Sequence, residues 1–214
     1  MFLTIINDSR DENAFGRQAT RAVSLFGCSA VTIGVADDLE AAGNLVDSLD
    51  ASEGREGIVL VNVAPRQKYG KKLDKGSVGF AAFKAAKREN GSPFGFFYYH
   101  KTLVVSSIDG QTLSLVKKLG IADRITVLDI AATGKALMES GTIDPAVAER
   151  MAATQFRSYE FLPRVAQWIV SGQPVVSAEQ ALDVPDAPKA IWWVDSFGTV
   201  KPTLVPADVL FAAG

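Results

Sequence analysis

The sequence has very few of the residues on which several common kinds of site depend. Its one cysteine, Cys28, excludes an intrachain disulfide and any multi-cysteine metal site. Its one histidine, His100, would have to serve any Ser-His-Asp or Cys-His system, yet it lies in a predicted hairpin turn and is interpreted as a surface residue. No GxGxxG or Walker-type glycine loop follows a predicted strand. We therefore expect neither a metal site nor nucleotide binding through helix-cradled phosphates.

A charge excess and a long hydrophobic run are also absent. The 214 residues contain 22 Lys and Arg against 24 Asp and Glu, so no overall field recruits nucleic acid or an anionic membrane. No apolar run approaches the roughly 18 to 20 residues that span a bilayer, and Met1 leads directly into a predicted strand without a secretory signal. With 48% apolar and 21% charged residues, the chain is typical of a folded globular protein, which we expect in the cytoplasm.

Short apolar runs alternate with stretches of helical spacing in the first part of the chain. The runs cover residues 2–6, 31–35 and 57–63, and the helical stretches cover residues 14–25 and 39–49. This alternation predicts βαβ units, and hence an α/β fold with a three-layer, mainly parallel sheet.

The later elements predict a domain with a short appendage. We expect two strands at 94–99 and 102–106 around a tight turn, a helix at 112–119, a strand at 124–130, and helices over 144–172 with an interruption near Pro163. The predicted α/β domain therefore covers residues 1–172. Residues 173–188, which contain three prolines, are predicted to be a linker. Residues 189–214 are predicted to form a truncated C-terminal β segment that starts with a strand at 191–194.

Residues 7–13 (NDSRDEN) are all polar and follow the first predicted strand. Connections in α/β units are usually about 2 to 6 residues long and need no such chemistry. In a parallel α/β sheet the carboxyl ends of the strands are where ligands bind, so we interpret this loop as a site for hydroxyl groups. The alternative is that Asp8 or Ser9 caps the next helix and the other charges are solvated.

A basic segment at residues 68–90 separates the third predicted strand from the fourth. Its Lys and Arg residues could cover an anionic ligand or form a mobile lid. A solvated surface helix that buries Phe80 and Phe83 is the reading that the spacing favours.

Four separated stretches, in the right order, resemble one protein family. Residues 7–13 are similar to its Asp-containing first loop, and residues 154–163 (TQFRSYEFLP) to its Thr-Phe segment. Residues 194–203 (VDSFGTVKPT) resemble its Ile-Asp-x-Phe-Gly-Asn entry into a C-terminal β domain, and residues 107–110 (SIDG) its Pro-Asn/Asp-Asn-Gly segment. These motifs are typical of the S-adenosylmethionine hydroxide adenosyltransferases and their relatives, the fluorinase and chlorinase.

That family binds S-adenosylmethionine and displaces methionine from the ribose C5' by an SN2 attack of hydroxide or halide. The resemblance implies an adenosyltransferase-like protein whose substrate is S-adenosylmethionine and which needs no further cofactor. It also implies that the partners are a small nucleoside or sulfonium ligand and other copies of the chain, since the family's sites form between the subunits of a homotrimer.

The same resemblance assigns roles to individual residues. Asp8 should hold the ribose hydroxyls, Asp11 and Asn13 should line the same loop, and Phe156 and Ser158 should border the reacting centre.

Further candidates come from the other stretches. Asp195, Phe197 and Thr199 should approach the nucleoside or methionine part from a neighbouring subunit. Asn62, in the third predicted strand, is a further substrate-binding candidate. The residues expected to guide the nucleophile are Arg157, Ser158 and Lys71, with Lys72 as the alternative lysine.

The sequence also departs from the family's pattern. Ala64 stands where the water-using members carry an Asp that helps to activate water, and Arg157 stands in place of their histidine. Thr199 replaces an asparagine, and most of the C-terminal domain, including the part that would hold adenine, is missing. Three hypotheses follow: an enzyme acting on S-adenosylmethionine, a binding protein without turnover, and a structural or assembly protein.

Overall fold

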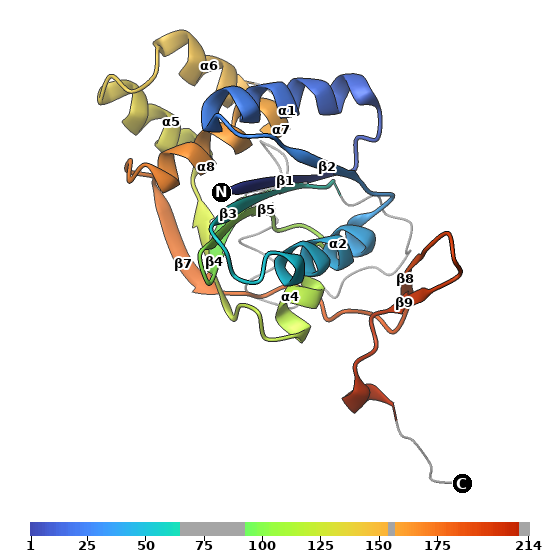
Figure 1. Ribbon diagram of the computed structural model, residues 1–214. Helices are drawn as coiled ribbons and strands as arrows, with labels where there is room; N and C mark the ends of the chain where they lie inside the picture. The colour runs from blue at the N-terminus through green and yellow to red at the C-terminus, as the bar shows by residue number, and fades with distance from the viewer. Residues whose placement is uncertain (65–92, 154–156, 210–214) are drawn as a thin grey trace, which may run out of the picture.

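The structure is a computed structural model that describes residues 1–64, 93–153 and 157–209. Within these ranges, seven strands form one sheet in the order β2-β1-β3-β5-β4-β6-β7, and β8 and β9 form a small separate sheet (Figure 1). The strands of the large sheet are β1 (Phe2–Asn7), β2 (Val31–Gly34), β3 (Gly57–Asn62), β4 (Phe94–Tyr99), β5 (Thr102–Ser107), β6 (Arg124–Leu128) and β7 (Ser177–Ala181). Because β2, β1, β3 and β5 are parallel neighbours, the predicted α/β fold with a mainly parallel sheet is confirmed.

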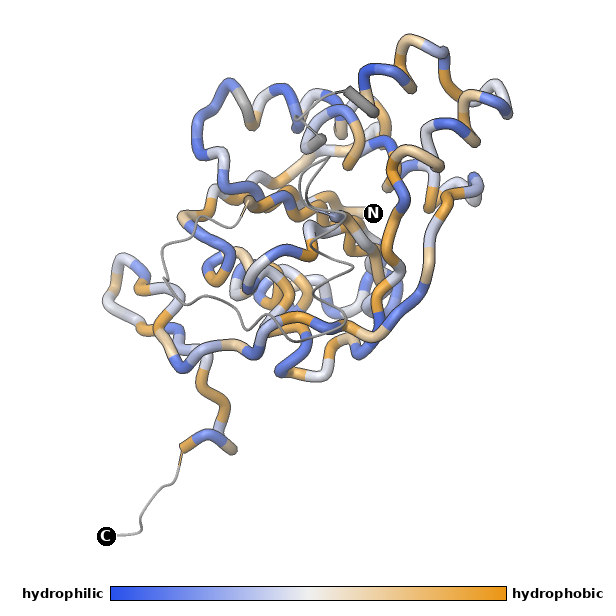
Figure 2. Tube along the Cα trace, turned by 180° about the vertical axis from the view of Figure 1, so that it is seen from behind, coloured by the Kyte–Doolittle hydropathy of each residue, from blue (hydrophilic) through white to orange (hydrophobic). Residues whose placement is uncertain are grey.

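The central strands are buried on both faces. Leu3 and Ile5 of β1 belong to one hydrophobic cluster, whereas Ile6 belongs to the other. Successive side chains of a strand point to opposite faces, so a strand covered on both sides needs a continuous apolar run. Figure 2 shows such hydrophobic residues concentrated in the central strands. The apolar runs of the sequence therefore correctly predict the strands at the centre of the sheet.

Helices cover the two faces of the sheet unequally. One face carries α1 (Glu12–Phe26), α5 (Ile130–Glu139), α6 (Pro145–Ala153), α7 (Arg157–Glu160) and α8 (Leu162–Val170), and the other carries α2 (Asp38–Ala51) and α4 (Ser114–Lys118) (Figure 1). The interruption predicted near Pro163 separates α7 from α8. Cys28 is half-buried. Among the described helices, none combines the length and apolarity needed to cross a membrane.

The sheet becomes antiparallel beyond β5. β4 and β5 form the expected hairpin, and His100 occupies its tight turn with a φ of 52°. The helix α5 was not predicted, because residues up to Ile130 were assigned to the preceding strand. In the structure, β6 ends at Leu128, and the side chain of Asp129 accepts a hydrogen bond from the N–H of Ala132 at 2.9 Å. This N-cap starts α5 at Ile130.

The segment predicted as a linker contributes a strand to the main sheet. β7, at residues 177–181, pairs antiparallel with β6 over five residues. Leu182 and Val184, which follow β7, are both buried in the cluster beneath α2 and α4. The prediction of a free linker over residues 173–188 is therefore wrong: the backbone of this segment completes the sheet, and its apolar side chains complete a core.

The C-terminal segment forms a hairpin that rests on α2. Its strands are β8 (Ile191–Val194) and β9 (Val200–Pro202), and the short 3-10 helix η1 (Pro206–Asp208) follows. The indole of Trp192 lies directly over Gly43 of α2, while Trp193 is 42% exposed. Lys201 also forms an ion pair with Asp47 of α2. The two tryptophans therefore face opposite sides of the strand, as their adjacent positions predict.

Candidate functional site

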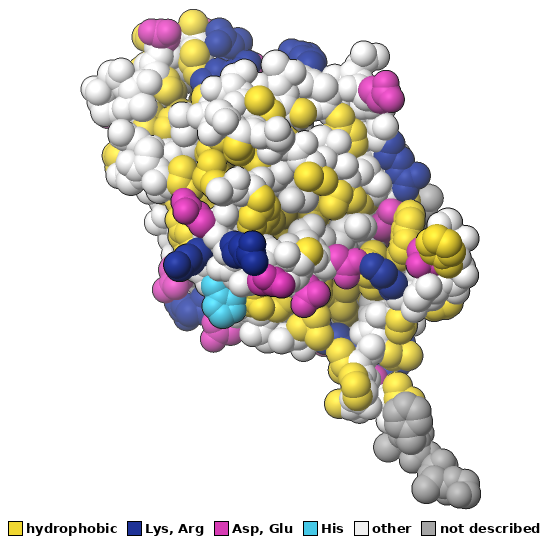
Figure 3. Space-filling view, in the orientation of Figure 1, with side chains coloured by type: hydrophobic (Ala, Val, Ile, Leu, Met, Phe, Trp, Pro, Cys, Tyr) yellow, Lys and Arg dark blue, Asp and Glu magenta, His cyan; other side chains and the backbone are white. Residues whose placement is uncertain are grey.

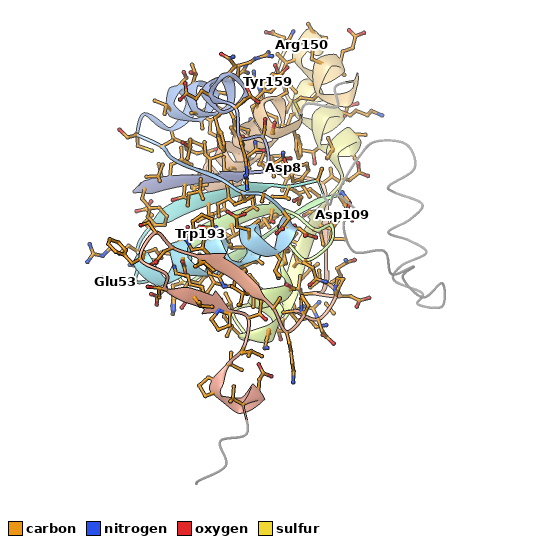
Figure 4. All side chains as sticks on the ribbon, turned by 90° about the vertical axis from the view of Figure 1, so that its right-hand side faces the viewer. Asp8, Glu53, Asp109, Arg150, Tyr159 and Trp193 are labelled. Carbon is orange, nitrogen blue, oxygen red and sulfur yellow. The ribbon has the colours of Figure 1, made fainter. Side chains whose placement is uncertain are left out.

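The carboxyl ends of β1, β3 and β5 meet at one edge of the sheet. Asn7 of β1 is in register with Asn62 of β3, and the N–H of Asp8 approaches the carbonyl of Asn62 at 3.4 Å. The carboxylate Oδ2 of Asp8 accepts a hydrogen bond from the N–H of Ala64 at 3.1 Å. The structure therefore brings together Asp8 and Asn62, two of the predicted binding residues. Figure 4 views this side of the molecule and labels Asp8 and Asp109.

The end of β3 is also held from the β5 side. The hydroxyl of Ser107 accepts a hydrogen bond from the N–H of Val63 at 3.2 Å and donates one to the Val63 carbonyl at 3.1 Å. Ser107 is only 1% exposed, so both bonds are shielded from water. Asp8 and Ser107 thus fix consecutive peptide units of the strand exit from opposite sides. Sequence reasoning placed Ser107 in a motif but did not assign it this role.

The loop at residues 7–11 is organised by its own side chains. The N–H of Ser9 donates to Oδ1 of Asn7 at 2.9 Å, and the hydroxyl of Ser9 donates to Oδ2 of Asp11 at 3.1 Å. The carbonyl of Asp11 accepts the N–H of Phe15 at 3.1 Å, which begins α1. Neither Asp8 nor Ser9 has a hydrogen bond to the first turn of α1 within the described residues. The carboxylate of Asp8 is instead directed to the exit of β3.

Beneath this loop, two amides are buried as a pair. Nδ2 of Asn7 donates to Oε1 of Gln18 at 2.7 Å, with the two residues 2% and 0% exposed. Nε2 of Gln18 has no hydrogen-bond partner in the described part of the chain. The pair joins the end of β1 to the middle of α1, so it sets the position of the loop above it. Sequence spacing gave no signal for this contact.

The connection between β2 and α2 and the first turns of α2 also contact this edge of the sheet. Oε2 of Glu40, whose side chain is 8% exposed, accepts the N–H of Ala36 at 2.7 Å and lies 3.4 Å from Nη2 of Arg10. A nearby carboxylate, that of Asp38, accepts the N–H of Gln111 at 2.7 Å. These contacts tie the loop after β1 and the turn after β5 to the start of α2.

The buried residue Asp109 lies in that turn after β5. It is 4% exposed, and its carbonyl accepts the hydroxyl of Thr112 at 2.9 Å. Within the ranges that the structure describes, no three His, Cys, Asp or Glu side chains are grouped as a metal site would require. Among the described residues, this edge of the sheet offers hydrogen-bonding groups such as the carboxylate of Asp8.

The remaining N-terminal and central candidates are distributed differently. Asp11 and Asn13 are both exposed, and Asn13 lines a shallow groove beside Tyr159. Ser158 is half-buried in α7. Arg157 is the first residue of the same helix. Phe156, Lys71 and the alternative Lys72 lie outside the described residues, as does the basic segment at 68–90.

The C-terminal candidates share one turn between β8 and β9. Oδ1 of Asp195 accepts the N–H of Phe197 at 2.9 Å and that of Thr199 at 2.8 Å. The hydrogen bonds from Thr199, followed by that from Phe197, lower the pKa of Asp195 below its ordinary value. Phe197 is 93% exposed at the tip. Among the described residues, no hydrogen bond or ion pair joins this turn to the loop that contains Asp8.

Of the comparisons with known proteins, the one with solved structures bears on the fold. No family model matches the sequence, and no curated protein matches it. Among solved structures, the chain is similar to an uncharacterized conserved protein from Thermotoga maritima, with a TM-score of 0.59. The two are 11% identical, and the match covers 94% of this chain and 71% of that one. At this identity the similarity establishes an α/β architecture alone.

Proposed function

We propose that the protein binds S-adenosylmethionine at the shared edge of β1, β3 and β5 and acts as an adenosyltransferase-like enzyme. The observation that carries the proposal is the geometry of Asp8. Its half-buried carboxylate has one oxygen fixed by the N–H of Ala64 at 3.1 Å, at the edge where α/β sheets bind their ligands.

A carboxylate held in this way suits a vicinal diol. It can accept a hydrogen bond from each of two neighbouring hydroxyls, and the charge on the acceptor strengthens both bonds. The bond to Ala64 limits rotation of the Asp8 side chain, so less conformational freedom is lost when a ligand binds. A ribose placed here would lie over the exit of β3, next to Asn62.

The proposed reaction requires alignment rather than covalent help from the protein. A lone pair of hydroxide or another anion forms a bond to the ribose C5', the C5'–S bond breaks, and its electron pair stays on sulfur. The products are methionine, now a neutral thioether, and adenosine or its substituted analogue. The protein must position the anion in line with the sulfonium and exclude competing water. We assign that role to Arg157, Ser158 and Lys71, with a homotrimer as the active form.

A second candidate function is binding without turnover. The residue that fixes Asp8 is Ala64, whose side chain is an exposed methyl group. In the family that the sequence resembles, the water-using members carry an acid at this position. A methyl group has no means to orient or deprotonate water. The ligand site is thus compatible with a protein that senses or carries an adenosyl compound.

Calorimetry and product analysis with S-adenosylmethionine test both candidates. Binding with release of adenosine and methionine supports the enzyme, and binding without products supports the second candidate. If neither S-adenosylmethionine nor adenosine binds, both candidate functions are refuted. That outcome favours the hypothesis of a structural or assembly protein.

A matched pair of variants locates the site. Asp8→Asn removes the charge with little change of shape and should weaken binding at least tenfold, in line with the strength of charge-assisted hydrogen bonds. Asp50→Asn makes the same change at an exposed position of α2 and should leave binding unchanged.

A further inference from the structure

A groove runs along the outer face of α1, where α7 packs beside it. Its volume is about 460 Å³, within the range of small-molecule sites. Its lining residues are Glu12, Asn13, Gly16, Arg17, Thr20, Arg21, Ser24 and Tyr159. Apart from Asn13, none of them belongs to the proposed adenosyl site. Figure 3 shows basic side chains gathered at the upper edge of the molecule, over α1 and α6.

Positive charge exceeds negative charge behind this groove. Glu160, which is 8% exposed, lies 3.6 Å from Nη2 of Arg21 and 3.8 Å from Nε of Arg164. Both separations exceed hydrogen-bond length, and neither Oε2 of Glu160 nor Nε of Arg164 has a hydrogen-bond partner in the described chain. Burial lowers the pKa of Arg164, and the charges of Arg21 and Arg150 lower it further. Arg21 and Arg164 thus share one carboxylate, and Arg150 adds a further positive charge near Arg164.

Arg17 and Arg21 present guanidinium groups on one face of α1. Residues four apart on a helix are neighbours, with about 5–6 Å between their Cβ atoms. Two planar forks at this spacing can each donate to different oxygens of one phosphate. Cζ of Arg17 lies 4.1 Å from the ring centroid of Tyr159, which sets the orientation of its fork. Thr20 belongs to the same lining.

Among the described residues, nothing packs where the side chain of Gly16 would lie. Gly16 lies within α1, and a Cβ built there would meet nothing within 4 Å. Glycine is among the poorest helix formers, so an alanine at this position would favour the helix. In the part of the chain that the structure describes, the glycine leaves open space in the groove between Asn13 and Arg17.

We propose that the groove between α1 and α7 binds a small phosphorylated molecule. Arg17 and Arg21 hold the phosphate oxygens, Tyr159 forms a wall, and Gly16 admits the ligand to the helix surface. A dianionic phosphate offsets the positive charge that Glu160 leaves uncompensated. This site makes no use of Asp8, so it stands or falls independently of the adenosyl proposal.

Calorimetry on the full chain at constant ionic strength tests the site. The probes are inorganic phosphate and glycerol 3-phosphate, with glycerol as the uncharged control. We expect saturable binding of one equivalent with a Kd of about 1 mM or tighter for the phosphorylated probes and none for glycerol. The absence of saturable binding would overturn the proposal. Binding of an acidic peptide without binding of either phosphate would also overturn it, in favour of a protein partner.

Three variants distinguish a specific phosphate site from nonspecific electrostatic attraction. Arg17→Gln should weaken phosphate binding at least tenfold. Arg55→Gln removes the same charge from a side chain that is 77% exposed and pairs with Glu53, and should change nothing. Gly16→Ala should weaken binding while the fold is retained, which circular dichroism verifies. An equal loss in Arg17→Gln and Arg55→Gln, or unchanged binding in Gly16→Ala, would contradict the proposed site.

Discussion

Replacing Gly43 by alanine should release the C-terminal hairpin from α2. A Cβ at Gly43 would lie 2.2 Å from Cδ2, 2.3 Å from Cε2 and 2.5 Å from Cε3 of Trp192. All three distances are far shorter than carbon atoms tolerate, so the indole must leave its position. Trp192 of β8 packs on Gly43 of α2, and Lys201 forms an ion pair with Asp47 of α2. Within the hairpin, the ammonium of Lys201 also lies 5.2 Å from the ring centroid of Trp192.

The size of the effect depends on the packing and the ion pair that are lost and on the helix propensity that is gained. A fully buried tryptophan removes 150–250 Å² from water, which at about 25 cal/mol per Å² gives about 4 to 6 kcal/mol. Because Trp192 is half-buried, the packing at risk is about half of that, or about 2 to 3 kcal/mol. The exposed pair of Lys201 with Asp47 adds at most about 1 kcal/mol. Within α2, the change from glycine to alanine gains about 1 kcal/mol of helix propensity.

Fluorine NMR with labelled tryptophan shows whether the indole of Trp192 leaves α2, since the chain has three tryptophans in different environments. In Gly43→Ala, the resonance of Trp192 should move to the position of a solvated indole, while that of buried Trp168 stays in place. Gly134→Ala is the matched control, because its Cβ would lie an ordinary 3.8 Å from Met151. An unchanged Trp192 resonance in Gly43→Ala, or an equal shift in the control, would refute the reasoning.

Two further predictions concern the buried amide pair and the hairpin turn. Gln18→Leu leaves Nδ2 of Asn7 without its acceptor, so chemical denaturation should show a loss of about 1–3 kcal/mol, and the double variant with Asn7→Leu should lose less than the sum of the two single changes. Hydrogen bonds from Thr199 and Phe197 lower the pKa of Asp195 below its ordinary value of 3.8, so their stabilisation is complete above that pH and is lost as the pH falls through the lower folded pKa. In an NMR titration the amide signals of Thr199 and Phe197 should follow the carboxyl signal of Asp195, and independent titration would contradict this.

The sequence predicts well the elements whose side chains carry a pattern. The apolar runs of β1 and β3 are long and continuous because both faces are covered, so they could be recognised without the structure. β7 could not, since its sequence SAEQA is exposed at every position and it joins the sheet through backbone hydrogen bonds to β6. Such pairing leaves no hydrophobic signal. The helix after Asp129 was missed because Ile130 reads equally well as the end of a strand.

The candidate site also has one part that the sequence predicts and another that it does not. The loop with Asp8 could be predicted because seven consecutive polar residues, from Asn7 on, come at the end of a buried strand. The contacts that hold it could not: Ala64 is 56 residues from Asp8, and Ser107 reaches Val63 across 44 residues. These partners depend on the order β1-β3-β5 in the sheet, which local periodicity does not encode. Gln18 is likewise an unremarkable helix residue until α1 is packed on β1.

β7 is synthesised well after its partner strand β6, which affects how the protein folds on the ribosome. β6 ends at Leu128 and β7 begins at Ser177, so the hydrogen-bonding edge of β6 has no partner until the later segment emerges from the ribosome. At about 5 to 20 residues per second, this interval lasts roughly 2 to 10 seconds. During that time the nascent chain exposes an unpaired strand, which is a template for intermolecular association. Translation speed between residues 128 and 177 is therefore expected to affect the yield of folded protein.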